Sequence, residues 1–351
     1  MRKVLYLLPL VIFFFACHKE EILTPSNADE TTLIEYPDMS KPLVSQYKND
    51  YNVSIVYRFN DVTDFRFAFM DRVSVTNWNK VNIQKVDENA PDYALQMLDS
   101  LVLKYFNDEI VFQGQTFTSD FRKTYFPKHI FVADSISGSY SAIGQKLGEL
   151  NLYETEKYYS FLWNGYEPMF AFNKAVLSVA SASGILKYRN SMLYCFLSEL
   201  FMQKGIHNQF PAAMYEPVVS YYGTSINDLA ESEGVARNYS GPGNRYVHYD
   251  PVWYNAKGFA LTNRSPFSIS TYSNTTSYKA TLDSTATLTF PDKDRDFRNL
   301  LHVMICENSV SNIQTYLFDE VFKARMRIFI EEMYKRGIDV FLVNPAMKQY
   351  F

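Results

Sequence analysis

The stretch 195–207, CFLSELFMQKGIH, brings together residue types that could do chemistry. Ser198 and Met202 lie four positions apart, so their side chains would share one face of a helix. Two histidines at that spacing, with a glutamate beside the first, form the H-E-x-x-H zinc helix, whose glutamate activates a metal-bound water. Here only Glu199 has the required type, since a hydroxyl binds zinc poorly and a thioether suits softer metals. The stretch fits either an ordinary buried helix or a zinc helix that has lost its ligands.

The histidines do not supply a replacement site by their spacing. None of the five lies four positions from another, and they are His18, His129, His207, His248 and His302. Folding could bring His207 and His302 together as metal ligands; the alternative is that each is a hydrogen-bonded structural residue. The sequence contains no G-x-S-x-G elbow, no P-loop and no C-x-x-C pair.

The N-terminus has the form of a signal peptide. MRKVLYLLPLVIFFFAC begins with basic residues, continues with an apolar run too short to span a bilayer, and reaches Ala16 before Cys17. A small residue directly before a cysteine resembles a bacterial lipobox. We therefore predict a signal peptide over 1–16, then a lipidated Cys17 and a flexible polar tether over 17–42. A plain secretory signal is the alternative.

The residues behind the cysteine indicate where the anchored protein would lie. Lys19, Glu20 and Glu21 resemble the short export signal that sends some Gram-negative lipoproteins to the outside of the outer membrane. Lipid chains on Cys17 would hold the protein to the membrane through buried methylenes. We expect a lipid-anchored protein of the outer membrane that faces the cell exterior.

Composition limits the partners and describes the core. The chain has 351 residues, 47% hydrophobic and 21% charged, and a net charge of −4, so it offers no basic field for nucleic acid. The 27 Tyr and 28 Phe either fill a core or form stacking platforms for sugars or peptides. Cys195 and Cys306 lie in apolar stretches and are expected to be buried thiols, with a disulfide between them as the alternative.

Apolar periodicity predicts an α+β fold that starts with a sheet-forming half. The buried helix is expected to be enclosed on nearly all sides, because few polar residues interrupt it between Met192 and Met202. The expected elements are a half-buried strand over 52–59, a helix over 91–106, strands over 128–134 and 167–173, and a helix over 188–204 ended by Gly205.

The second half is predicted to be mostly helical, with a long irregular insertion over 232–292. Helices are expected over 296–308 and, as one long element, over 313–337, where Gly337 provides the stop. The domain would cover 43–351, with halves at about 43–205 and 206–351. Within the insertion, 238–254 is predicted to be a loop because of its Gly-Pro-Gly turn. Its aromatic residues either contact a ligand or pack among themselves: Tyr246, His248, Tyr249 and Trp253.

The order of these elements resembles a known family, the zinc-metallopeptidase-like lipoproteins associated with SusC/SusD-type outer-membrane importers. These are zincins related distantly to the lethal-factor class. The helix over 194–203 takes the place of the family's H-E-x-x-H helix. KGFALT (257–262) is similar to the family's DGFISP turn, and DKDRDFRNLLHVMICENS (292–309) to its NPNEDFAEMLSIMLCNS helix. The resemblance covers most of the chain from position 52 and implies a zincin-like fold with a mixed sheet.

The resemblance also implies a role for individual positions. The imidazole positions fall on Ser198 and Met202, and the general-base position on Glu199. The acidic residues of the later helix correspond to Arg295 and Asn299, and a tyrosine that often precedes this helix would fall near Leu288. Zinc is the family's cofactor, and its ligands are absent here. We therefore expect no intact metal site and no cofactor, with Glu199 either vestigial and ion-paired, Arg295 being the expected partner, or still catalytic.

Three functions remain open from the sequence. The first is a non-enzymatic surface lipoprotein that binds a peptide or glycan for a TonB-dependent SusC/SusD-type importer. The second is an active metal-dependent hydrolase, a peptidase with a noncanonical site, which a chelator would inhibit. The third is a structural or adhesive surface protein. The sequence favours the first, a pseudoenzyme with a degenerate metallopeptidase fold.

Overall fold

The structure is a computed structural model that describes residues 37–66, 81–138, 158–235, 238–240, 246–249, 251–260, 280–283 and 289–351. The helices are α2 (Pro42–Tyr51), α4 (Asp92–Leu101), α5 (Phe121–Tyr125), α7 (Lys174–Val179), α8 (Ala182–Gln203), α9 (Ala212–Tyr215), α10 (Ile226–Ser232), α11 (Pro251–Ala256), α12 (Lys293–Cys306), α13 (Val310–Tyr316), α14 (Glu320–Lys335) and α15 (Val340–Val343). The strands are β1 (Ser54–Val56), β2 (Val81–Lys85), β3 (Glu109–Phe112), β4 (Gln115–Thr118), β5 (His129–Gly138), β6 (Tyr158–Tyr159), β7 (Phe161–Trp163), β8 (Pro168–Ala171), β9 (Asn238–Ser240), β10 (Tyr246–Tyr249) and β11 (Ala280–Asp283).

The N-terminal half is built on a mixed six-stranded sheet. β5 lies between β1 and β8 and runs parallel to both, while β7 pairs antiparallel with β8. The farther part of β5 pairs antiparallel with β2 and β6. The predicted α+β class and mixed sheet are therefore confirmed, and the strands expected over 128–134 and 167–173 correspond to β5 and β8.

Both faces of this sheet are covered. Alternate residues point to opposite faces of a strand, so Ile55, Ile130 and Phe170 join the main core with the helices. Their neighbours form a second cluster on the other face, together with Phe65: Val56, Phe131 and Met169. The prediction of a half-buried first strand is wrong, because a strand that pairs in parallel between two packed layers is buried on both sides.

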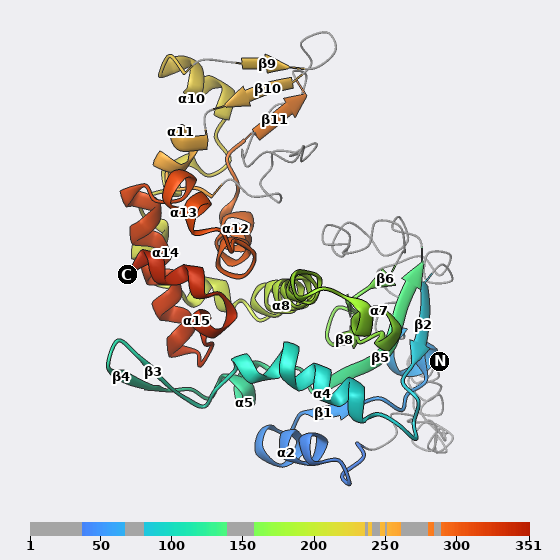
Figure 1. Ribbon diagram of the computed structural model, residues 1–351. Helices are drawn as coiled ribbons and strands as arrows, with labels where there is room; N and C mark the ends of the chain where they lie inside the picture. Colours follow the sequence, from blue (N-terminus) through green and yellow to red (C-terminus); the bar gives the residue numbers. More distant parts are fainter. Residues whose placement is uncertain are drawn as a thin grey trace, which may run out of the picture.

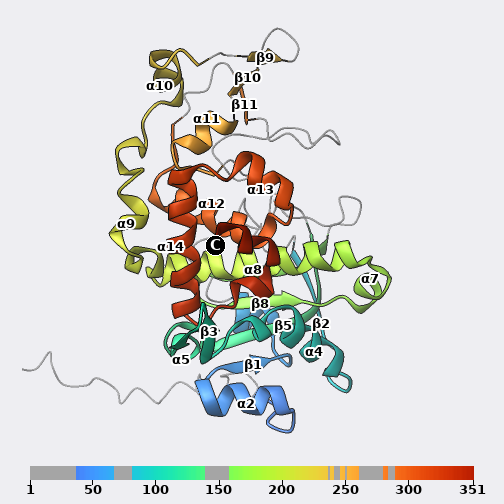
Figure 2. The same cartoon turned by 60° about the vertical axis from the view of Figure 1, so that its left-hand side comes forward.

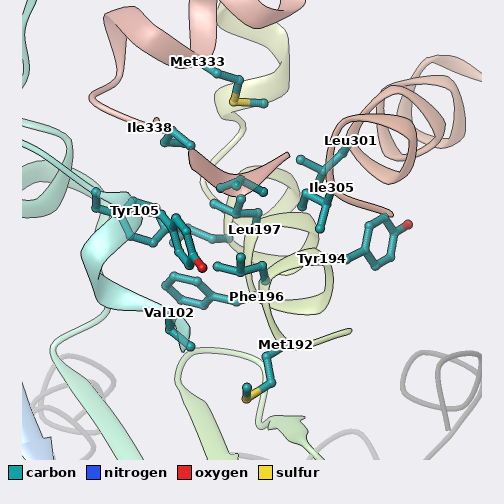
Figure 3. Packing of buried hydrophobic residues seen from close by; sticks show 14 of the residues in the cluster. Val102, Tyr105, Met192, Tyr194, Phe196, Leu197, Leu301, Ile305, Met333 and Ile338 are labelled. Carbon is teal, nitrogen blue, oxygen red and sulfur yellow. The ribbon is translucent and has the colours of Figure 1, made fainter. Parts of the chain in front are cut away.

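Helix α8 crosses the middle of the molecule, between the sheet and the helical half (Figures 1 and 2). Every residue from Asn190 to Phe201 is buried, as the sequence predicted. Figure 3 shows why: Phe196 lies toward Val102 and Tyr105, whereas Tyr194 lies on the opposite side, beside Leu301 of α12. Gly205 follows the helix with φ 64°, the left-handed conformation that ends it.

The C-terminal half contains a break that was not predicted. Apolar periodicity suggested one helix over 313–337, but the chain forms α13 and α14 with a turn at 317–319 between them. The side chain of Asp319 accepts a hydrogen bond from the backbone N–H of Val321 (2.9 Å) and so begins a new helix. Gly337 follows α14 with φ 72°, as expected of its stop.

The insertion holds more regular structure than predicted. β10 pairs antiparallel with both β9 and β11, and α11 follows β10. The prediction that 238–254 is a loop is wrong, because β9 and β10 lie within it as an antiparallel pair and α11 begins at Pro251. The third strand, β11, comes from a segment distant in sequence. The small sheet lies beside α10, and above α11 in the view of Figure 1, at one end of the molecule.

The last residues of the predicted tether contact the folded domain. The Tyr57 hydroxyl donates a hydrogen bond to Asp38 (2.5 Å), and Lys41 pairs with Asp92 at 2.7 Å. Hydrogen bonds from Ser40 and Tyr57 lower the pKa of Asp38 to about 2. None of the helices within the described ranges has the length and apolar character needed to cross a membrane.

Candidate functional site: the α8–α12 interface

The positions singled out by the sequence meet where α12 packs against α8. Phe201 stacks on Phe297 with ring centroids 5.5 Å apart, and Tyr194 meets His302 edge-to-face at 5.4 Å. As the numbers rise on α8 they fall on α12, so the helices run antiparallel here. Ser198 lies four residues after Tyr194 and three before Phe201, so it belongs to the same face. The fold thus brings the expected ligand helix and the later helix together.

Glu199 forms an ion pair with an arginine that the sequence analysis did not select. Nη1 of Arg298 lies 3.5 Å from Oε1 of Glu199. The Glu199 side chain is 8% exposed and that of Arg298 26% exposed, so the pair lies at the edge of the core. An ion pair is a stable arrangement for a carboxylate that burial would otherwise destabilise. The prediction of an ion-paired Glu199 is confirmed, but the partner is Arg298.

Arg295 lies elsewhere for a local reason. Asp292 caps α12 by accepting a hydrogen bond from the backbone N–H of Arg295 (2.8 Å). This cap places Arg295 in the first turn, where its side chain is 60% exposed and its Nε is 3.9 Å from Asp292. The prediction of a Glu199–Arg295 pair is therefore wrong. Arg298 and His302 are four positions apart and share the face that contacts α8.

The other positions that the resemblance relates to metal ligands lie at or near this interface. Ser198 and Asn299 are 2% and 1% exposed, and Met202 is half-buried. The Ser198 hydroxyl has no hydrogen-bond partner in the part of the chain that the structure describes. Cys195 is buried on α8 and Cys306 half-buried on α12, and both remain thiols. Leu288, the position expected for a tyrosine, lies outside the described residues.

The two histidines near the interface have separate structural roles. The buried His207 places its Nδ1 3.2 Å from the carbonyl oxygen of Phe201 and its Nε2 3.1 Å from Asp294. His302 packs against Tyr194. It lies eight residues after Asp294, the partner of His207, which corresponds to about 12 Å along the axis of α12. The interpretation of His207 as a hydrogen-bonded structural residue is confirmed. No three His, Cys, Asp or Glu side chains gather as metal ligands within the described ranges.

A fully buried ion pair adjoins the interface and was missed by the sequence analysis. Arg325 of α14 and Asp296 of α12 are both 0% exposed and are joined through Nη2 and Oδ2. Arg325 also donates from Nε to the carbonyl of Met214 (2.7 Å) and from Nη1 to that of Gly258. The Tyr222 hydroxyl donates to Asp296 at 2.7 Å. Burial and the negative charge of Asp296 raise the pKa of Tyr222.

The candidate ligand residues of the insertion are described only in part. Tyr246, His248 and Tyr249 form β10, and the structure describes their backbone but not their side chains. The half-buried Trp253 lies on α11 and donates its indole N–H to Glu233 at 2.7 Å. Cys17 and the segment 1–36 lie outside the described residues.

Comparisons with known proteins add no relative. No protein-family model, no curated protein and no solved structure matches this chain. The resemblance to metallopeptidase-like lipoproteins therefore depends on the residues named above, and the function must be argued from the site.

Proposed function

We propose that this chain is a lipoprotein of the outer cell surface with a degenerate metallopeptidase-like helix pair, which binds a peptide or a glycan and does not hydrolyse it. The signal-peptide form of 1–16, Cys17 and the Lys-Glu-Glu segment support the surface anchor. The expected partner is a TonB-dependent SusC/SusD-type importer, which takes up what the lipoprotein binds.

The ion pair between Glu199 and Arg298 is the main support for the proposal that the chain does not catalyse hydrolysis. A general base must accept a proton from water, and in a zinc helix the metal lowers the pKa of that water. Here the carboxylate instead faces a guanidinium, which keeps its charge and has only donors to offer. Ser198 and Met202 replace the imidazoles that would orient a metal-bound water. The arrangement stabilises the interface electrostatically and leaves Glu199 no proton-transfer role.

A hydrolysis assay with Glu199→Gln tests this proposal. The full chain, in detergent, is incubated with a mixture of peptides, with and without added zinc and with a chelator, and products are detected by mass spectrometry. We expect no cleavage above the blank, and the same result for Glu199→Gln. The control is Glu331→Gln, which removes a surface carboxylate that pairs with Lys335. Cleavage that a chelator and Glu199→Gln abolish, but Glu331→Gln does not, would refute the proposal.

A further inference from the structure

A cluster of aromatic and charged side chains lies on the surface next to the small sheet, between α10 and α11. Glu233 follows α10, and its two carboxylate oxygens accept hydrogen bonds from Nε1 of Trp253 (2.7 Å) and from Nζ of Lys257 (2.6 Å). The same ammonium lies 5.7 Å from the centre of the Trp253 ring and 6.0 Å from that of Tyr221. Four side chains from three segments therefore meet around Lys257; we name them the Trp253 cluster.

The Trp253 cluster is held in place from below. Phe290 is 1% exposed. Its ring centroid lies 6.3 Å from that of Trp253 and 5.5 Å from that of Tyr221. Phe290 in turn stacks on the buried Tyr254 with the ring planes 2° apart. The two outer rings therefore sit on a packed aromatic layer, and the hydrogen bond at the indole nitrogen fixes the rotation of Trp253. A ligand would meet side chains that are already ordered, which lowers the entropy cost of binding.

The Trp253 cluster combines aromatic rings, a hydrogen-bond acceptor and a hydrogen-bond donor. Trp253 and Tyr221 are half-buried, so neither residue is fully enclosed by the fold. Glu233 is 35% exposed at its side chain and Lys257 17%, so an acceptor and a donor stand beside the rings. A carboxylate has lone pairs left after two hydrogen bonds, and an ammonium has donors left after one. Their charges cancel, so the cluster exerts no strong net attraction on ions.

This combination fits a neutral sugar better than an ion or a peptide. A pyranose ring has an apolar C–H face that packs on an aromatic ring, and its neighbouring hydroxyls each donate and accept hydrogen bonds. A carboxylate ligand would meet the charge of Glu233. A peptide that binds as an added strand requires a row of unpaired backbone groups. The Trp253 cluster instead consists of side chains from three separate segments, so it does not offer such a row.

We propose that the Trp253 cluster binds a neutral glycan, with Trp253 and Tyr221 contacting a pyranose face while Lys257 and Glu233 bind its hydroxyls. This inference rests on the proposed binding function and specifies its ligand class and its place in the fold. It assigns ligand contact to Glu233, Lys257 and Tyr221 beside the previously expected Trp253. None of the four residues of the cluster belongs to α8 or α12, so the two proposals concern different residues.

Calorimetric titration of the full chain in detergent micelles tests the inference. The probes are the linear hexaoses of glucose, xylose and mannose, and an equimolar mixture of hexapeptides serves as the alternative ligand. We expect saturable binding of at least one hexaose, with an affinity that added salt changes little. In Trp253→Ala we expect the affinity to fall by at least about tenfold. Tyr166→Ala is the control, because Tyr166 is 60% exposed in the turn between β7 and β8.

The outcomes separate this inference from the proposed function. Trp253→Phe retains a ring, so it should recover much of the lost affinity. Circular dichroism spectra and unfolding midpoints of Trp253→Ala that match those of the wild type exclude misfolding as the cause. Hexaose binding that is equal in Trp253→Ala and wild type would overturn the inference but leave the proposed function intact. Binding of the peptides alone, or of no probe, would also overturn it. Chelator-sensitive hydrolysis of a bound probe would instead refute the proposed function.

Discussion

Arg325 occupies a place where a charged side chain must be fully compensated. It lies on the apolar face of α14 between Phe322 and Phe329, and it is 0% exposed. All three of its guanidinium nitrogens donate hydrogen bonds. Two donate to backbone carbonyls and the third to the carboxylate of Asp296. The pair ties α12 and α14 to the segments that contain Met214 and Gly258. Such a pair is costly to break, whatever its net contribution to stability, because the remaining charge has no access to water.

Replacing Arg325 by methionine should therefore destabilise the protein strongly. Arg325→Met leaves Asp296 buried without its cation, and we expect the free energy of unfolding to fall by about 3–5 kcal/mol. Lys335→Met removes the ion pairs of this surface lysine with Glu331 and Glu332. It should cost less than about 1 kcal/mol, because Glu332 keeps its pair with Arg336. Urea denaturation followed by circular dichroism measures both. Similar small losses for the two variants would contradict the structural role of the buried pair.

At the same scale, the sequence indicates some partners and not others. An arginine at position 325, on a stripe with Phe322 and Phe329, signals a buried ion pair, although it does not identify Asp296. The pairing of Glu199 with Arg298 instead of Arg295 depends on the rotation of α12. That rotation follows from the cap at Asp292 and from the stacking of Phe297 on Phe201. Contacts of this kind arise from packing between distant segments, which one sequence does not reveal.

The elements themselves were predicted where the signals are local. β5, β8 and α8 were expected from periodicity, and Gly205 and Gly337 end their helices with positive φ. The break between α13 and α14 was missed because apolar residues continue through it, although Asp319 carried the capping signal. The strands β9 and β10 are neighbours in sequence and were missed because the Gly-Pro-Gly turn between them was interpreted as part of a longer loop, whereas β11, the other partner of β10, is distant in sequence. Local propensity thus predicts helices and buried strands better than it predicts isolated pairings.

The turn at Gly258 gives a prediction at the scale of elements. Gly258 has φ 86°, and a Cβ there would lie 2.8 Å from Cγ1 of Val218 and 2.9 Å from Cγ1 of Val321. Gly258→Ala should lower the free energy of unfolding in two ways. The alanine would strain the left-handed backbone, and overpacking against α14 would remove a further amount of about 1–3 kcal/mol. Gly114 has a similar φ of 79° with nothing within 4 Å, so Gly114→Ala should cost only the backbone strain.

The measurement is the thermal unfolding midpoint of each glycine variant. We expect the midpoint of Gly258→Ala to fall clearly further than that of Gly114→Ala, because only Gly258 has neighbours that must move. Equal shifts would mean that packing at the turn does not constrain the chain, and that the carbonyl of Gly258 does not depend on this geometry to reach Arg325.

The whole molecule consists of a sheet-forming half and a helical half that meet along α8 (Figure 1). Its fold class and the order of its main elements could be predicted from the sequence, as could the meeting of the helix at Glu199 with the later helix. The partners of Glu199 and of Arg325 and the composition of the Trp253 cluster could not be, since each contact joins side chains from separate segments. The pair of Glu199 with Arg298 and the Trp253 cluster are the contacts that support the proposed function and ligand class.

The zinc content of the purified full chain tests the central claim most directly. The protein is prepared without chelator and analysed by plasma mass spectrometry, before and after incubation with zinc and removal of the excess. Because Ser198 and Met202 stand at the spacing where a zinc helix has its imidazoles, and Arg298 supplies the charge that faces Glu199, zinc should be present only at trace level and should not rise on incubation. Zinc near one ion per chain, retained after removal of the excess, would contradict the account and indicate that the chain holds a metal centre.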